Sequence, residues 1–321
     1  MKRSRLGNSG IEIAPLALGG NVFGWTVDET TGFRILDAFV AGGGNMIDTA
    51  DTYSRWIPGN EGGESETIIG KWMKTRGNRD KVVIATKVGS DMGANRKGLS
   101  RNYITVAVED SLRRLRTDYI DLYQSHKDEP DTPLEETLGA YADLIRQGKV
   151  RAIGASNYSA PRMAEALMLS ETQGYPKYET LQPRYNLYDR AEYEIMLEPL
   201  CRTKGISVIP YYSLASGFLT GKYRSRDDLS KSARGQSARM YLNGRGVRIL
   251  NALDVVAQRQ NAPLATIALA WLMARPGIAA PIASATSVEQ LAELLRAMTL
   301  ELDEASHELL ARVSVERAAA A

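Results

Sequence analysis

The strongest constraint on the fold is an alternation of short apolar runs with longer amphipathic segments, repeated eight times along the chain. The apolar runs have the character of buried strands and occupy residues 16–18, 46–47, 82–86, 119–123, 150–153, 180–182, 206–210 and 278–282. The segments between them have helical periodicity and occupy residues 29–41, 65–74, 100–115, 134–147, 160–169, 192–204, 263–274 and 287–297. Such an alternation predicts a parallel sheet covered by helices, and eight repeats favour a closed (β/α)8 TIM barrel over a doubly wound sheet.

The domain organisation follows from length and from segments that exceed a minimal barrel. The chain has 321 residues with no linker and no long-period repeat, which predicts one α/β domain over residues 1–321. A typical barrel has about 250 residues. The additional segments are an N-terminal hairpin at residues 5–13, a loop rich in Gly, Ser and Arg at residues 217–246, and a tail helix at residues 301–313.

Composition excludes several classes of protein. Hydrophobic residues make up 44% and charged residues 24%, which is typical of a compact folded domain and argues against a membrane span. The net charge of +2 is too balanced for the basic face of a nucleic-acid binder. His126, His307 and Cys201 are too few for a zinc site built from His and Cys, so we expect no metal. A single cysteine and a polar N-terminal segment favour a cytoplasmic protein.

Four side chains that can carry acid–base chemistry follow three consecutive strands. Asp48 and Tyr53 follow the second strand, Lys87 ends the third, and His126 ends the fourth. In a barrel these ends meet at one rim. A tyrosine with a pKa of about 10 is a weak acid at neutral pH, but a nearby ammonium such as Lys87 would lower that pKa. Asp48 could hold Lys87, and His126 could donate a hydrogen bond to a substrate oxygen or relay a proton.

This set of residues resembles the aldo-keto reductase family, nearest its bacterial members related to the potassium-channel β-subunit branch. The matching motifs occur in the family's order at residues 48–53, 85–87, 126, 154–157, 182–186, 211–222 and 286–291. The resemblance implies reversible reduction of an aldehyde, ketone or sugar carbonyl to an alcohol. It implies Tyr53 as general acid, Lys87 and Asp48 as the residues that tune it, and His126 as the residue that orients the carbonyl.

The resemblance also implies a nicotinamide cofactor. Ser156, Asn157 and Gln182 would hold the nicotinamide carboxamide, Tyr211 would stack on the ring, and the loop at 217–246 would cover the pyrophosphate. The other implied cofactor contacts are Gly20, Asp48, Ser213, Leu214, Ser216, Lys222, Arg234, Ser284, Thr286, Gln290 and Glu293. NADPH is expected, with NADH as the alternative.

The chain departs from the family pattern at two of the implied cofactor contacts and at two residues adjacent to such contacts. Thr286 stands where some relatives have an arginine for the 2′-phosphate, and Ser284 stands where many have glycine. Leu294 replaces a common asparagine, and Tyr212 replaces a frequent serine. Without an arginine at position 286, NADH stays possible as the cofactor. Leucine at position 294 predicts the loss of one contact with the adenine.

Two other functions stay open on the sequence. A cofactor-sensing regulatory protein with little turnover could share the barrel, and a Schiff-base aldolase could use Lys87 as nucleophile. We expect a small-molecule carbonyl or sugar as substrate, selected by Trp25, Trp56 and Tyr185, and no nucleic acid or membrane as partner. The residues give no indication of an oligomeric state.

Overall fold

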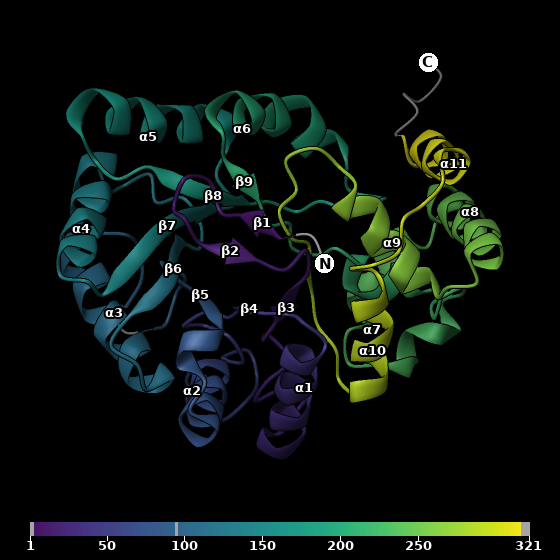
Figure 1. The fold of residues 1–321 in the computed structure, drawn as a ribbon, viewed down its shortest axis with the longest axis horizontal. Helices are drawn as coiled ribbons and strands as arrows, with labels where there is room; N and C mark the ends of the chain where they lie inside the picture. Colours follow the sequence, from purple (N-terminus) through teal and green to yellow (C-terminus); the bar gives the residue numbers. More distant parts are fainter. Residues whose placement is uncertain (1–2, 94–95, 316–321) are drawn as a thin grey trace.

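In the computed structural model, which describes residues 3–93 and 96–315, eight parallel strands form a ring surrounded by helices (Figure 1). The strands are β3 (Ala17–Gly19), β4 (Met46–Asp48), β5 (Val83–Val88), β6 (Ile120–Ser125), β7 (Val150–Ser156), β8 (Tyr178–Gln182), β9 (Ser207–Val208) and β10 (Ile282–Ala283). Each strand pairs with the next, and β10 pairs with β3. The ring closes through a parallel bridge between Val208 and Ile278 and a hydrogen bond from the Ile282 N–H to the Pro210 carbonyl. The predicted (β/α)8 barrel is confirmed.

The helices lie outside the ring, and several of them begin at a side chain that caps the first turn. Asp28, Ser100 and Ser159 accept hydrogen bonds from backbone N–H groups in the first turns of α1, α3 and α5, as N-cap residues do. The main helices are α1 (Glu29–Ala41), α2 (Glu64–Arg76), α3 (Arg101–Leu115), α4 (Leu134–Arg146), α5 (Ala160–Gln173), α6 (Glu198–Lys204), α8 (Gly244–Gln260), α9 (Leu264–Met273), α10 (Val288–Arg296) and α11 (Glu304–Ser314).

The sequence pattern missed α8 and the local structure of the segment before it. Gly244 and Gly246 are weak helix formers in the first turn of α8, and the Asn243 side chain starts the helix by accepting from the N–H groups of Arg245 and Gly246. Residues 217–246 are also less irregular than a loop. They contain short helical turns, among them Asp227–Lys231, α7 (Gly235–Ala238) and Arg239–Tyr241.

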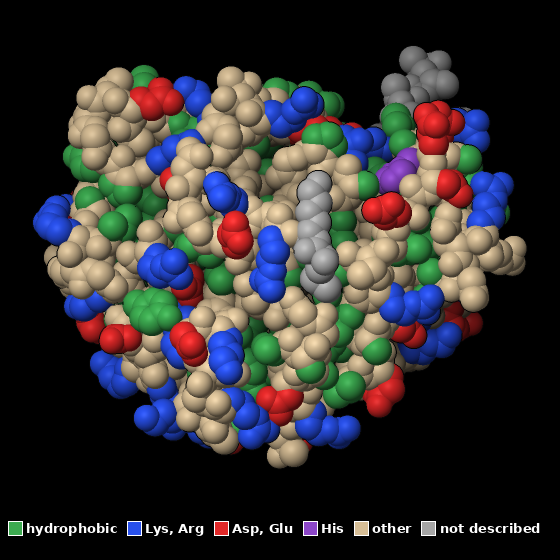
Figure 2. Space-filling model, in the orientation of Figure 1, with side chains coloured by type: hydrophobic (Ala, Val, Ile, Leu, Met, Phe, Trp, Pro, Cys, Tyr) green, Lys and Arg blue, Asp and Glu red, His purple; other side chains and the backbone are tan. Residues whose placement is uncertain are grey.

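A hairpin closes the N-terminal end of the barrel. Strands β1 (Ser4–Arg5) and β2 (Glu12–Ile13) pair antiparallel and cross the ring in Figure 1. Their side chains join a buried interior cluster made of Leu6, Ile11, Ile13, Ala17, Met46, Val83, Ala85, Leu122, Ala152, Ile209, Ala279, Ala280 and Ile282. The face seen in Figure 2 carries interspersed acidic and basic side chains. Since apolar side chains fill this end, a reactive site has to lie at the opposite rim.

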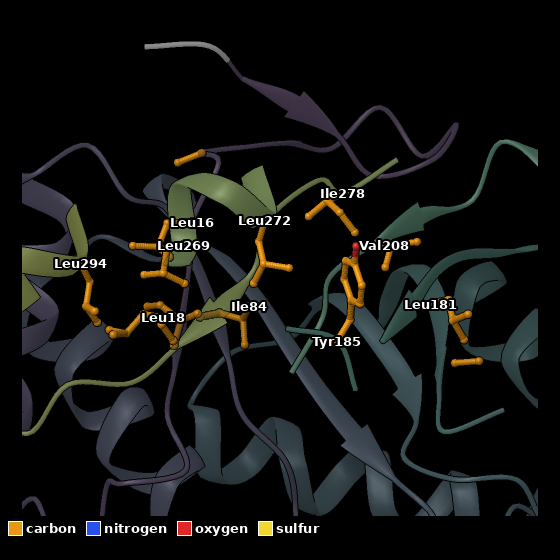
Figure 3. Close-up of a cluster of buried hydrophobic side chains, with 14 of the residues drawn as sticks. Leu16, Leu18, Ile84, Leu181, Tyr185, Val208, Leu269, Leu272, Ile278 and Leu294 are labelled. Carbon is orange, nitrogen blue, oxygen red and sulfur yellow. The ribbon is translucent and has the colours of Figure 1, made fainter. Parts of the chain in front are cut away.

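A second apolar layer lies between the strands and the helices. Leu16, Leu18 and Ile84 on the strand side and Leu269 and Leu272 of α9 belong to this layer (Figure 3). None of the helices in the described residues is long and apolar enough to cross a membrane. The hairpin and the two layers fix the strand ends from which the functional side chains project.

Candidate functional site

Asp48, Tyr53 and Lys87 form one hydrogen-bonded cluster at the C-terminal rim. The Lys87 Nζ donates to Asp48 Oδ2 at 2.7 Å, to the backbone oxygen of Thr49 at 2.7 Å and to the Tyr53 hydroxyl oxygen at 3.0 Å. The Tyr53 hydroxyl lies 3.3 Å from Asp48 Oδ2. Asp48 and Lys87 are buried, whereas Tyr53 is half-buried. The cluster therefore places one phenolic group at the boundary between the core and the rim.

Backbone pairing beyond the regular strands sets this geometry. The N–H of Thr49 donates to Ala85 O at 2.8 Å, and the N–H of Asp51 donates to Lys87 O at 3.3 Å, so the chain after β4 stays beside β5. A turn then follows, in which the N–H of Tyr53 donates to the carbonyl of Ala50. This turn brings the Tyr53 hydroxyl back over Asp48 and Lys87.

The second oxygen of Asp48 is held by two glutamine side chains. Gln182 Nε2 donates to Asp48 Oδ1 at 2.9 Å, and Gln124 Nε2 lies 3.5 Å from the same oxygen. Gln124 was missed by the sequence reasoning. An amide near the end of strand β6, two positions before His126, was the signal that could have identified it. Both carboxylate oxygens of Asp48 thus have partners, which fixes its orientation.

Burial sets the pKa directions in this cluster. Burial, followed by the neighbouring Asp48 carboxylate, raises the pKa of Tyr53 well above its ordinary value. Burial lowers the pKa of Lys87, while Asp48 acts in the opposite direction. The expectation that the Tyr53 pKa is lowered is therefore wrong for this resting arrangement, because burial and Asp48 both disfavour the phenolate. The phenol keeps its proton at neutral pH.

His126 lies beside Tyr53 as an uncharged imidazole. The two ring centroids are 6.0 Å apart, and the planes meet at 72°. Burial, with the positive charges of Lys87 and Lys127 adding to it, lowers the pKa of His126 to about 3. Its Nδ1 is buried and has no hydrogen-bond partner among the described residues. At neutral pH the ring can donate one N–H but carries no positive charge.

Of the three side chains expected to select substrate, two lie at the rim and one does not. Trp25 and Trp56 meet edge to face at 5.5 Å, and Trp56 lies 6.2 Å from Tyr53 between ring centroids. Tyr185 is fully buried, packs on Trp271 and donates its hydroxyl hydrogen bond to Glu194 at 2.7 Å. The substrate role expected for Tyr185 is wrong, because core packing removes its ring from the rim.

The residues expected to hold the nicotinamide end are connected by hydrogen bonds. Asn157 Nδ2 donates to the backbone oxygen of His126 at 2.9 Å and to Ser156 Oγ at 3.0 Å. The Tyr211 hydroxyl donates to Asn157 Oδ1 at 2.7 Å, and Ser156 Oγ donates to Gln182 O at 2.9 Å. Four side chains from three separate motifs thus lie next to the Asp48 cluster.

Gly20 lies at the same rim, where its backbone is held close to β4. Its N–H donates to the carbonyl of Asp48 at 2.7 Å. A Cβ at this position would lie 2.8 Å from Ser65 Oγ, which is closer than Cβ contacts normally occur. A glycine is therefore required here by space.

The cations of the 217–246 segment divide into paired and unpaired groups. Arg224 forms a bidentate pair with Asp254 at 2.7 and 2.8 Å, and Lys231 pairs with Asp228 at 2.6 Å. Within the described part of the chain, Lys222 and Arg234 pair with no carboxylate. The Arg234 guanidinium lies 5.4 Å from the centre of the Trp25 ring, and burial lowers its pKa. Its Nη2 is buried with no partner there.

The remaining expected cofactor residues lie in two groups. Ser213, Leu214 and Ser216 follow β9, and the Ser213 hydroxyl already donates to the carbonyl of Pro210 at 3.0 Å. Ser284, Thr286, Gln290 and Glu293 lie between β10 and α10 or on α10.

The group at α10 has its own internal contacts. Ser284 Oγ lies 2.6 Å from Asn21 Oδ1, while the Thr286 N–H and hydroxyl donate to Gln290 Oε1 at 3.0 Å. Leu294, which replaces the common asparagine, is buried in the apolar layer of Figure 3.

No group of three or more His, Cys, Asp or Glu side chains in the described ranges could hold a metal ion. The polar groups at the rim include a phenol, an ammonium, a carboxylate, an imidazole and amides. These groups can donate a proton, orient a carbonyl and hold a flat polar ring.

Comparison with known proteins gives one consistent family. The model of the Aldo/keto reductase family matches residues 15–314, which include all eight strands of the barrel. The chain is 35% identical to Uncharacterized oxidoreductase YrpG of Bacillus subtilis, over 94% of this chain and 93% of that protein. It is 32% identical to Protein tas of Escherichia coli over 95% of each chain. It is also 35% identical to Aldo-keto reductase AFTS1 of Alternaria alternata, over 95% of this chain and 88% of that protein.

Proposed function

Since this chain belongs to the aldo/keto reductase family, we propose that it reduces a carbonyl compound to an alcohol with NADPH, and that Tyr53 donates the proton. One observation carries the proposal. The Tyr53 hydroxyl lies 3.0 Å from Lys87 Nζ, and Lys87 in turn lies 2.7 Å from Asp48 Oδ2. A phenol beside a buried, fixed ammonium is suited to giving up its proton only when negative charge develops on a neighbouring oxygen.

The raised pKa of Tyr53 fits this role. A general acid has to hold its proton before the reaction, and burial with the Asp48 contact keeps the phenol protonated. When the proton moves to the substrate oxygen, the phenolate that remains is 3.0 Å from the Lys87 ammonium. The neutral His126 donates an N–H to the carbonyl oxygen and so orients and polarises it.

The residues present fit a nicotinamide cofactor. A bound cofactor supplies the hydride, so the protein itself has to hold the nicotinamide ring and align the substrate carbonyl with it. Ser156, Asn157 and Gln182 carry hydroxyl and amide groups of the kind that recognise a carboxamide, and Tyr211 carries an aromatic ring. Asn157 and Tyr211 are hydrogen-bonded to one another at 2.7 Å, so both are fixed before a ligand binds.

The cofactor phosphates suit the unpaired cations of residues 217–246. Arg234 Nη2 is buried without a partner, which is a cost for a guanidinium unless an anion binds there. We therefore propose Lys222 and Arg234 as the pyrophosphate ligands and residues 217–246 as the segment that covers it, within one domain. Ser284, Thr286, Gln290 and Glu293 are proposed for the adenosine end, with NADPH preferred to NADH.

The contacts of Lys87 argue against a Schiff-base aldolase. All three protons of its ammonium are used in hydrogen bonds, to Asp48, Thr49 and Tyr53. A nucleophilic amine needs a lone pair that is open to the substrate. Burial lowers the pKa of Lys87, but its nitrogen is enclosed in the core and faces Asp48, Thr49 and Tyr53.

The test is a cofactor titration followed by a panel of carbonyl substrates. NADPH and NADH binding is measured by the fluorescence of the reduced nicotinamide, and turnover by loss of its absorbance. Tyr53→Phe should bind NADPH as wild type does and lose at least about a hundredfold in kcat, which is the low end of general-acid contributions. Tyr175→Phe, far from the cluster in sequence and outside its hydrogen bonds, is the matched control. Wild-type turnover in Tyr53→Phe would refute the assignment, and NADPH binding without turnover of any carbonyl would favour the cofactor-sensing function.

A further inference from the structure

Trp56 is the most unusual exposed side chain near the proposed reaction centre. Its side chain is 49% exposed, although a large aromatic ring is normally well covered in a soluble protein. It lies in residues 55–63, a segment that no catalytic or cofactor role above uses. Its position beside the proposed proton donor calls for a physical explanation.

Four rings form a continuous edge-to-face series at the rim. Trp25 and Trp56 lie 5.5 Å apart at 87°, and Trp56 and Tyr53 lie 6.2 Å apart at 64°. Tyr53 and His126 continue the series at 6.0 Å and 72°. These separations are within the range at which aromatic rings attract one another. The series places the exposed ring of Trp56 directly beside the ring of Tyr53.

The segment that carries Trp56 is fixed by polar contacts. Asn60 Nδ2 donates to the carbonyls of Gly24 and Ser54, both at 3.0 Å, which ties the segment to the chain before α1. Arg55 Nη1 donates to the carbonyl of Asp91 at 3.0 Å. Trp56 is therefore held at the rim by a constrained backbone, and its exposure does not result from a loose loop.

These same contacts occupy several polar groups of the segment that carries Trp56. The amide of Asn60 and one guanidinium nitrogen of Arg55 are directed to backbone carbonyls, and the N–H groups of Glu61 and Gly62 donate to Glu64 Oε1 at 2.9 and 3.1 Å. A sugar would need free donors and acceptors for its hydroxyls. An aromatic ring needs none of these groups and can pack directly on the exposed indole.

We propose that Trp56, supported by Trp25, is a specificity-determining residue that selects carbonyl compounds in which the C=O group is attached to an aromatic ring. This inference rests on the proposed carbonyl reduction and narrows its substrate class. The ring of such a substrate packs against Trp56, and its carbonyl group then lies toward the Tyr53 hydroxyl and His126. Substrates without a ring gain nothing from Trp56.

The experiment compares benzaldehyde, cyclohexanecarbaldehyde, propanal and glyceraldehyde with NADPH in the wild type, Trp56→Ala and Trp56→Phe. Since an aromatic pair contributes about 0.5–1.5 kcal/mol, Trp56→Ala should raise KM for benzaldehyde roughly two- to tenfold with kcat nearly unchanged. KM for propanal should stay constant, and Trp56→Phe should recover most of the loss. Met168→Ala, an exposed apolar side chain on α5, is the control.

Each contrary result has a distinct meaning. An equal rise of KM for benzaldehyde and propanal, no rise for either, or a larger effect on glyceraldehyde would overturn the proposal. If no carbonyl oxidises NADPH in the wild type, the proposed function fails instead. In that case quenching of tryptophan fluorescence by benzaldehyde in the presence of NADP⁺ tests the ring contact directly. The expected result is quenching in the wild type and in Met168→Ala that is reduced in both Trp56→Ala and Trp56→Phe, because both variants lack the indole at the contact; equal quenching in all four proteins would overturn the proposal.

Discussion

Replacing Lys87 by Met tests the electrostatic basis of the proposed proton donor. The substitution keeps an unbranched side chain of similar length in a buried position and removes the ammonium that lies 3.0 Å from the Tyr53 hydroxyl. Two unit charges at this distance interact by about 5.5 kcal/mol at an effective dielectric constant of 20. That energy corresponds to roughly four pKa units of stabilisation of the Tyr53 phenolate.

The expected kinetic effect is smaller than the full electrostatic energy. If about half of the phenolate charge has developed in the transition state, the loss is near 3 kcal/mol, or roughly a hundredfold in kcat. The same change leaves the buried Asp48 carboxylate without its ion pair, which costs about 3–5 kcal/mol of folding free energy. Adding Asp48→Asn removes the unpaired charge, so the double variant should recover part of that stability.

The assay is kcat with saturating NADPH, together with thermal unfolding and nucleotide binding of each variant. Lys204→Met, which breaks a surface pair with Glu171, is the matched control and should retain full kcat. The reasoning is refuted if folded Lys87→Met turns over within about threefold of the wild type. It is also refuted if the double variant recovers kcat along with stability, since the ammonium is absent from both.

Three further predictions concern ionisation and packing. Since burial lowers the pKa of His126 to about 3, its ring proton signals in NMR should stay constant between pH 5 and 8. Below about pH 6.5 the unfolded chain binds a proton at this histidine and the folded protein does not, so the free energy of unfolding falls as the pH is lowered. The urea midpoint should therefore decrease toward pH 4, and it should decrease less steeply in His126→Gln. Burial, together with the negative charge of Glu66, raises the pKa of Asp51 to about 8. Between about pH 4 and pH 8 the folded protein therefore holds a proton on Asp51 that the unfolded chain has lost, and the free energy of unfolding decreases as the pH rises. The melting temperature of Asp51→Asn should exceed that of the wild type by more at pH 8 than at pH 5, and a constant difference would contradict this. A Cβ on Gly70 would lie 2.2 Å from the carbonyl oxygen of Arg114, so Gly70→Ala should cost about 1–3 kcal/mol in denaturant unfolding. Gly244→Ala should be neutral or stabilising, because a Cβ there would make only an ordinary contact with the Arg248 side chain at 3.8 Å.

The sequence by itself determined the order of strands and helices and the position of the reactive groups. Strand and helix periodicity are local properties, because side chains alternate every second residue in a strand and return every third or fourth residue in a helix. Eight repeats of that pattern were enough to predict the barrel, and the barrel implies that Asp48, Lys87 and His126 share one rim. The helix α8 was missed because it is an additional helix between β9 and α9, outside the simple alternation of one strand with one helix.

The tertiary structure alone decided burial, partners and therefore ionisation. Tyr185 and Tyr53 are both tyrosines in segments that match the family pattern. The ring of Tyr185 is enclosed by the core, whereas the ring of Tyr53 reaches the rim. The direction of the Tyr53 pKa, the second contact of Asp48 with Gln124, and the unpaired Arg234 depend on residues far apart in sequence. A local sequence pattern does not show which side chains contact one another across the barrel or how far each one is removed from solvent. These contacts and the extent of burial determine both the chemistry and the selectivity of the site.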